Sequence, residues 1–198
     1  MNKNFRLMTA LLYVVVFGIL ALAQDVKSGS DSPLQVGNPN AAFKIEVFYD
    51  FQCPSCVPFN EELKRVRKRF PDKVFVTFRH FPLPMHDKSV LSARVVEAAC
   101  RQDRCEEIIN QLLVNQKVWA WNRNAKQILF GYARRLKLDM IRFKEDFESK
   151  KTIERIESDR DRAKSLGLSS VPSVILNGKE LSYIEALDLE AIILKGNK

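Results

Sequence analysis

An α/β pattern interrupted by a long helical stretch is the feature that most limits how this chain can fold. Residues 43–51 and 73–81 have the apolar or alternating pattern of strands, and an amphipathic helix lies between them. Residues 85–166 then carry only helical patterns, over about 87–99, 104–115, 124–137, 139–149 and 150–165. The sequence therefore predicts an α/β core, at 43–84 and 167–198, with an inserted all-helical domain at 85–166.

The ends of this core have their own local signals. A strand, a helix and a second strand in succession favour a right-handed crossover with parallel strands. After Gly167, residues 173–176 form a strand and Asn177-Gly178 predicts a tight hairpin, because a type I′ turn needs positive φ at both central positions. A helix over 182–195 is expected to close the chain.

The first 23 residues resemble a targeting segment. Lys3 and Arg6 precede an almost wholly apolar run at 7–23, and Ala21-Leu22-Ala23 matches the small-x-small pattern of signal-peptide cleavage. An uncleaved N-terminal anchor is the alternative, since 17 apolar residues are the lower limit for crossing a bilayer. Either way a periplasmic or other extracytoplasmic location is expected. The polar residues 24–42 are interpreted as a flexible linker.

Export narrows the possible partners and the state of the cysteines. Loss of residues 1–23 removes two basic residues and no acid, so the formal net charge falls from +8 to +6. That charge could suit an anionic surface or solubility, whereas export argues against nucleic acid as a partner. All four cysteines lie in the exported part, where disulfides form and persist, and an even count suggests two pairs.

Cys53 and Cys56 lie three residues apart where a strand gives way to a helix, which is expected to start at Cys53 or Pro54. Free N–H groups and the helix dipole at such a position stabilise a thiolate. We therefore expect Cys53 to be the attacking thiolate and Cys56 the buried resolving thiol. A purely structural disulfide is one alternative. Half of a zinc site is the other, but the second cysteine pair has the wrong spacing for it.

The remaining candidate residues have plainer interpretations. Cys100 and Cys105 flank a break between two helices, and a structural disulfide is favoured over a second redox pair or two free thiols. His80 and His86 are too few to hold a metal, so they are expected to be surface or loop residues and no metal site is expected. Trp119 and Trp121 are expected to anchor the break that follows residue 118.

The whole set of motifs resembles one family. The run FYDFQCPSC at 48–56, the long helical insertion, and Val171-Pro172 followed by SVILNGK are together similar to the DsbA-like thiol–disulfide oxidoreductases of the thioredoxin superfamily. The resemblance spans about residues 33–195. It implies a thioredoxin fold with an inserted all-helical domain. It also implies that the Val171-Pro172 bond is cis, packs against the cysteine pair and offers backbone to a substrate peptide.

The chain departs from that family at two places. The best-known oxidases of the family carry His at the third motif position, where this chain has Ser55 after Pro54. Many relatives have an acidic residue six positions before the first cysteine, where this chain has Val47, with Glu46 expected on the opposite side of the strand. Asp50 is the nearest alternative for proton transfer. A milder oxidant is therefore expected, and Val171 resembles the oxidase branch more than the isomerase branch.

These observations favour one function and leave two others open. The favoured function is reversible exchange between a Cys53–Cys56 disulfide and the cysteines of exported proteins. The expected direction is oxidation of the client protein. A membrane redox partner is expected to reoxidise the pair, and no cofactor is expected. A reductase or isomerase would use the same chemistry in another direction. A peptide-binding or chaperone module with a merely structural disulfide would not use it at all.

Overall fold

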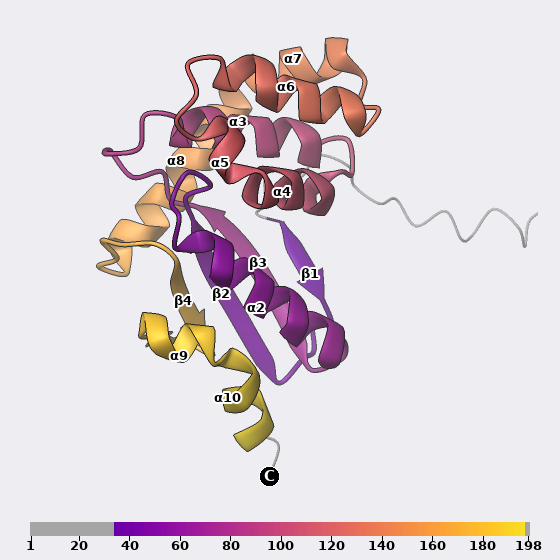
Figure 1. The fold of residues 1–198 in the computed structure, drawn as a ribbon. Coiled ribbons are helices and arrows are strands. Elements are labelled where there is room, and N and C mark those ends of the chain that lie inside the picture. The colour runs from indigo at the N-terminus through magenta and orange to yellow at the C-terminus, as the bar shows by residue number, and fades with distance from the viewer. Residues whose placement is uncertain (1–33, 197–198) are drawn as a thin grey trace, which may run out of the picture.

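The computed structural model describes residues 34–196, so the expected signal peptide or anchor at 1–23 lies outside the described residues. A five-stranded mixed sheet with the order β1-β3-β2-β4-β5 forms the centre of the fold (Figure 1). Its strands are β1 (Gln35–Gly37), β2 (Phe43–Tyr49), β3 (Val74–His80), β4 (Ser173–Leu176) and β5 (Lys179–Leu181).

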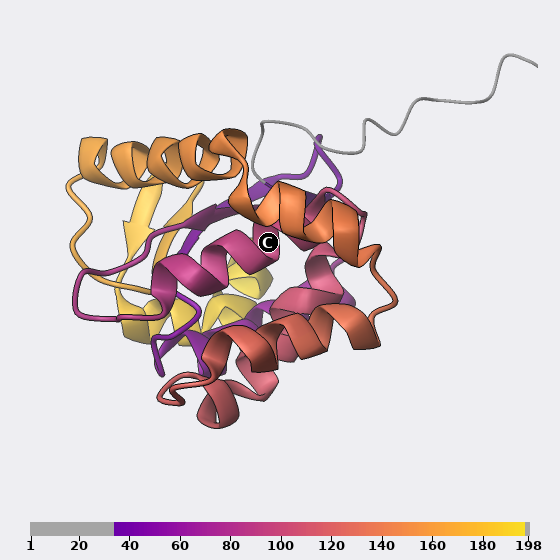
Figure 2. The same cartoon turned by 90° about the horizontal axis from the view of Figure 1, so that it is seen from above.

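Helices cover both faces of the sheet and extend beyond one end of it. Helix α2 packs with α9 and α10 over one face, and α8 packs against β3 on the other (Figure 2). Helices α3 to α7 lie together beyond the end of the sheet (Figure 1). The helices are α2 (Cys56–Arg69), α3 (Ser89–Cys100), α4 (Cys105–Val114), α5 (Gln116–Trp119), α6 (Ala125–Arg135), α7 (Met140–Glu148), α8 (Lys150–Ser165), α9 (Tyr183–Leu187) and α10 (Leu189–Lys195).

Strand pairing follows the expected connections. Strands β2 and β3 are parallel and joined through α2, whereas β4 pairs antiparallel with both β2 and β5. Asn177 and Gly178 both have positive φ, at 48° and 85°, as a type I′ turn requires. The Asn177 side chain also accepts a hydrogen bond from the Lys44 backbone N–H at 2.7 Å and donates to the Ala42 carbonyl at 2.9 Å. The turn therefore aligns the β4–β5 hairpin with the start of β2.

The fold class is the expected α/β sheet of thioredoxin type with an all-helical insertion. Helices α3 to α8 all lie in sequence between β3 and β4, and apolar residues of α3 to α7 join the same hydrophobic core as α2 and the sheet. Two details differ from expectation. A short extra helix, α5, precedes the break in the insertion, and the closing helix is divided at Asp188. Trp119 is fully buried at this break, as expected of an anchor. Trp121 is 69% exposed, so the expectation that it also anchors the break is wrong.

One part of the expected linker is a strand. Residues 35–37 form β1, which pairs antiparallel with β3, so the interpretation of all of 24–42 as a flexible tether is wrong for these residues. Gly37 allows the close approach, because its φ is +104° and a Cβ there would lie 2.3 Å from the Val74 carbonyl oxygen. A strand of three residues is too short to show the alternation by which strands are predicted from a sequence.

None of the helices between residues 34 and 196 has the length and apolar character needed to cross a bilayer.

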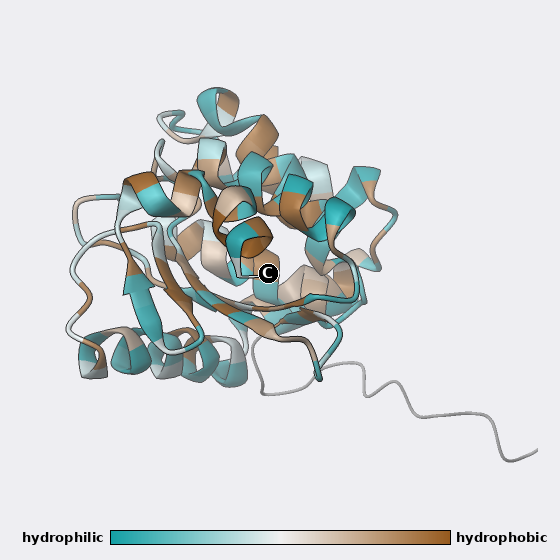
Figure 3. Cartoon of the chain, turned by 90° about the horizontal axis from the view of Figure 1, so that it is seen from below, coloured by the Kyte–Doolittle hydropathy of each residue, from teal (hydrophilic) through white to brown (hydrophobic). Residues whose placement is uncertain are grey.

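Helix α8 packs on the sheet through charges rather than through an apolar stripe, and Figure 3 shows it as a mostly hydrophilic ribbon against the sheet. The fully buried Asp159 carboxylate accepts hydrogen bonds from Arg79 at 2.8 Å, from the His80 backbone N–H at 2.9 Å and from Arg155 at 2.5 Å. Glu46 pairs with Arg79 and with Arg162 of α8, so it lies on the opposite side of β2 from the fully buried Val47, as expected. Because buried charges are stable only when paired, this network fixes α8 on the end of β3.

Replacing Asp159 by Asn should destabilise the protein strongly, because it leaves the buried Arg155 without its carboxylate partner and removes one of the two carboxylates that pair with Arg79. We expect the free energy of unfolding to fall by about 3 kcal/mol in a denaturant titration of the full chain. Asp161→Asn is the matched control on the same helix, since Asp161 pairs only with the exposed Lys164 at 3.1 Å, and it should change stability by less than about 0.5 kcal/mol. Equal losses in the two variants would contradict a structural role for the buried network.

Candidate active site

Cys53 lies in the turn between β2 and α2. Its backbone N–H donates to the Asp50 carbonyl at 3.0 Å, and its own carbonyl accepts from the Cys56 N–H at 3.2 Å. The regular helix begins at Cys56, and not at Cys53 or Pro54 as expected, because this first turn closes through a bond three residues apart. Ser55 already has helical φ and ψ of −67° and −20°. The Cys53 sulfur is therefore placed at the N-terminal end of α2, where the Ser55 backbone N–H hydrogen-bonds to it.

The two sulfurs have opposite electrostatic environments. Both are free thiols; Cys53 is 8% exposed and Cys56 is completely buried. A hydrogen bond from the Cys56 side chain, then one from the Ser55 backbone and the charge of His86, lower the pKa of Cys53 to about 6 against the opposing effect of its own burial. Burial, followed by the interaction with Cys53, raises the pKa of Cys56 well above its ordinary value. At neutral pH this pair therefore carries its negative charge on Cys53.

The Val171-Pro172 peptide bond is cis and lies against the first cysteine. The Cys53 sulfur is 3.7 Å from the Val171 carbonyl oxygen, although 118 residues separate them in sequence. Val171 and Pro172 are both buried at the start of β4. The structure therefore brings the Cys53–Cys56 pair and the Val171-Pro172 pair into one place.

The middle of the motif faces outward. Pro54 is exposed and Ser55 is half-buried. The Ser55 side chain makes no capping hydrogen bond, whereas its carbonyl accepts a long bond of 3.4 Å from the Tyr183 hydroxyl of α9. Neither residue brings a charge to the sulfur, so any charged neighbour must come from another segment.

Comparison with known proteins agrees with this geometry. Residues 30–195 match the family model described as thioredoxin. The chain is 32% identical over 150 residues to the probable disulfide bond formation protein D of Bacillus cereus, which covers 72% of this chain and 69% of that protein. This chain belongs to the thioredoxin family.

Two solved structures have the same fold as this thioredoxin-family chain. The oxidised BdbD structure from Bacillus subtilis superposes with a TM-score of 0.71 at 21% identity, over 83% of this chain and 92% of that one. The alpha-DsbA1 structure from Wolbachia pipientis gives 0.71 at 18% identity, over 81% and 88%. At these identities both similarities concern the fold, including its helical insertion.

Several relatives are much longer than this chain, which spans about a quarter of their length. The Na(+)/H(+) antiporter NhaA 1 of Mycolicibacterium gilvum is 30% identical over 146 residues, which is 72% of this chain but 23% of that protein. The antiporter name describes that longer protein, and it carries no ion-transport activity over to this chain.

His80 is not the surface or loop residue that is expected, whereas His86 does lie in a loop. His80 ends β3 and is buried, with its Nε2 2.8 Å from the Glu97 carboxylate of α3. His86 is half-buried in the β3–α3 loop, and its Nδ1 lies 2.6 Å from the Asp50 carboxylate. Within residues 34–196, no group of three or more His, Cys, Asp or Glu side chains is arranged to hold a metal ion.

Two buried glutamines near the motif were not anticipated. Gln116 of α5 donates from its Nε2 to the carbonyls of Phe51 at 2.8 Å and of Cys53 at 2.9 Å. Gln52, fully buried beside Cys53, donates to the Ala120 carbonyl at 2.7 Å and accepts from the Lys88 N–H at 2.6 Å. The helical insertion thus holds the loop that carries Cys53. No local pattern distinguishes such glutamines in a sequence, because their partners lie tens of residues away.

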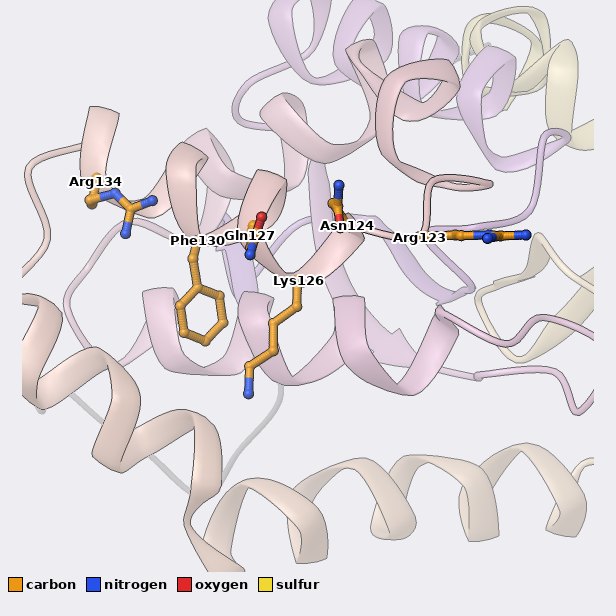
Figure 4. A pocket seen from close by; sticks show the side chains of 6 residues that line it. All are labelled: Arg123, Asn124, Lys126, Gln127, Phe130 and Arg134. Atoms are coloured by element: carbon orange, nitrogen blue, oxygen red, sulfur yellow. The ribbon is translucent and has the colours of Figure 1, made fainter.

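Two other features lie apart from the motif. A disulfide joins Cys100 at the end of α3 to Cys105 at the start of α4. A hollow of about 360 Å³ runs along α6 (Figure 4). None of the residues that line it belongs to the candidate active site; they are Arg123, Asn124, Lys126, Gln127, Phe130 and Arg134.

Gln116→Met should loosen the active-site loop while keeping the size of the side chain. The variant leaves the Phe51 carbonyl without its side-chain donor and removes one of the two donors to the Cys53 carbonyl, which costs about 1–3 kcal/mol. Hydrogen exchange of the Cys53 and Cys56 amides should accelerate by at least tenfold, and β-sheet amides should respond less. Gln127→Met, at an exposed position of α6, is the control and should leave both unchanged. Unaltered exchange at Cys53 in Gln116→Met would show that α5 does not hold the loop.

Proposed function

We propose that this protein is a thiol–disulfide oxidoreductase that exchanges a Cys53–Cys56 disulfide with the cysteines of exported proteins and acts mainly as an oxidase. The observation that carries the proposal is the contrast between the two sulfurs. The pKa of Cys53 is lowered to about 6 and that of the buried Cys56 is raised. One sulfur is thus suited to react with an external partner and the other to resolve the product.

The exchange has two balanced steps. A client thiolate attacks the Cys53 sulfur of the oxidised pair, so a client–Cys53 bond forms while the Cys53–Cys56 bond breaks and its electron pair leaves on Cys56. The raised pKa of Cys56 means that this sulfur then takes up a proton. A second client thiolate attacks the client sulfur of the mixed disulfide and expels Cys53 as a thiolate. The client loses two electrons and the enzyme gains them.

The direction follows from the same asymmetry. A sulfur that is stabilised as a thiolate is a good leaving group, and stabilising the reduced form makes its disulfide a stronger oxidant. The uncharged Ser55 adds no cation of its own, which supports an oxidant of moderate strength. A reduction potential between about −180 and −120 mV supports the oxidase assignment, and one near −270 mV supports a reductase.

Client recognition is assigned to the backbone beside the cis bond. Val171 precedes β4, and its carbonyl faces the Cys53 sulfur at 3.7 Å. An extended client segment that adds as a strand at Val171 places its own cysteine next to Cys53, and backbone bonding makes the recognition tolerant of sequence. Pro54 and Ser55, on the outer side of the motif, complete the contact surface.

The setting is extracytoplasmic, which includes the periplasm. The N-terminal segment of Lys3, Arg6 and the apolar run at 7–23 supports export. An oxidising compartment also suits the Cys100–Cys105 disulfide. Each catalytic cycle leaves Cys53 and Cys56 reduced, so a membrane redox partner is needed to accept the two electrons.

The pH dependence of Cys53 reactivity tests the thiolate assignment. Because the lowered pKa is about 6, the alkylation rate of the reduced protein should rise tenfold per pH unit below this value and level off above pH ~7. An ordinary thiol continues to gain rate up to about pH 8.5. Stopped-flow alkylation of Cys56→Ser, which leaves Cys53 as the single reactive thiol, isolates the group. The serine hydroxyl is a stronger hydrogen-bond donor than the thiol it replaces, so the midpoint of the variant differs from that of the wild type. The full chain is therefore measured beside it.

Cys53→Ser separates an oxidoreductase from a chaperone. The variant should lose all oxidation of a dithiol peptide, because no sulfur remains for the client to attack, while Cys100→Ser/Cys105→Ser should retain most of the turnover. Suppression of client aggregation by wild-type protein, undiminished in Cys53→Ser, together with no peptide oxidation by either, would assign a binding module instead.

A further inference from the structure

The Cys-Pro-Ser-Cys motif contains no charged side chain of its own. Pro54 and Ser55 offer no cation, and the helix that follows has no basic residue until Lys64. Hydrogen bonds from Cys56 and Ser55 lower the pKa of Cys53 against the effect of burial, and a charge also contributes to the lowering. A charged group from a different segment is therefore of interest.

His86 is that group among the described residues. It lies in the loop between β3 and α3, and its side chain is 12% exposed. Its Nδ1 is 2.6 Å from Oδ2 of Asp50, whose side chain is fully buried. The ring is thus fixed to a residue only three positions before Cys53.

Asp50 is itself held rigidly. Its Oδ1 accepts from the Gln52 N–H at 2.9 Å, and its Oδ2 accepts from the Leu83 N–H at 2.9 Å as well as from His86. The Asp50 carbonyl accepts from the Cys53 N–H at 3.0 Å. The same residue therefore fixes the histidine through its side chain and the reactive cysteine through its backbone.

We propose that His86, held by the buried Asp50 carboxylate, supplies the positive charge near the Cys53 sulfur that the motif itself lacks. This inference rests on the proposed function and adds a positioning residue to it. His86 acts on the thiolate through space, and Asp50 orients the ring and opposes its charge.

The two members of the pair act on Cys53 with opposite sign. The charge of His86 lowers the pKa of Cys53, whereas that of Asp50 raises it and also raises the pKa of Cys56. The other charged groups next to His86 along its loop are Asp87 and Lys88, which pair with each other at 2.6 Å. Neither contributes to the lowered pKa of Cys53. The loop thus has one cation that acts on the sulfur and one that does not.

This sign difference provides the experiment. Reduced full-length protein is titrated by the ultraviolet absorbance of the thiolate, and the reduction potential is measured against glutathione. His86→Gln should shift the Cys53 midpoint upward by about half to one pH unit and make the potential more negative. Asp50→Asn should shift the midpoint downward. Lys88→Gln removes a cation from the same loop and should leave the midpoint at its wild-type value.

A second variant guards against a simple folding defect. His86→Lys keeps a cation but not the ring, and its midpoint should lie nearer to wild type than that of His86→Gln. A merely structural role for the pair predicts that His86→Gln and Asp50→Asn shift the midpoint in the same direction, and that result would overturn the proposal. So would a wild-type midpoint in His86→Gln with intact circular dichroism.

The outcome is separable from that of the proposed function. If wild-type protein oxidises a dithiol peptide and Cys53→Ser does not, the function stands even when His86→Gln has no effect. If wild-type protein fails to exchange disulfides, the midpoints of the variants still report whether His86 acts on the Cys53 sulfur.

Discussion

Hydrogen bonds from buried polar side chains to the backbone of residues 50–53 are the constraint on which the geometry of the site depends. This loop leaves the sheet after β2, so its carbonyls and N–H groups have no ladder partners, and buried backbone groups must be paired. Gln116 supplies the donor for the carbonyls of Phe51 and Cys53, and the Asp50 carboxylate accepts from the Gln52 N–H. Because Gln116 belongs to the helical insertion, the insertion is a structural part of the site and not an addition to a finished domain.

The large elements of the fold could be predicted because their signals are local. Three signals each specify structure within a few residues. They are the alternation of apolar residues in β3, the helical periodicity of the insertion and the Asn177-Gly178 turn. The exceptions share a physical cause. Strand β1 has three residues and exists through its pairing with β3, and the helix start at Cys56 depends on how the turn at Cys53 closes. The polar contact between α8 and β3 could not be predicted either. In a sequence, a charged residue that pairs with another buried charge, as Asp159 does with Arg79, looks the same as one that faces water.

The candidate site divides in the same way. Cys53 and Cys56 can be recognised from their spacing at a strand-to-helix junction. Asp50 can be proposed from the sequence because it is only three residues before Cys53. Gln116 is bonded to a carbonyl 63 residues away and His86 to a carboxylate 36 residues away. A single polar residue with no motif beside it is predicted by default to lie at the surface. That default is wrong for His80, which is buried against the Glu97 carboxylate, while the loop residue His86 is paired with the buried Asp50 carboxylate.

The asymmetry of the two sulfurs needs contributions from both parts of the fold. The α/β core buries Cys56 in the first turn of α2, where burial, followed by the interaction with Cys53, raises its pKa. The same core leaves Cys53 at the open end of the helix, but it offers that sulfur only neutral donors. The charged pair of Asp50 and His86 lies at the junction between the core and the β3–α3 loop that leads into the insertion. Changes in that loop can therefore tune the reactive sulfur while the motif and the sheet stay as they are. Such tuning separates the strength of the oxidant from the stability of the fold, since His86 contributes to one and the apolar core to the other.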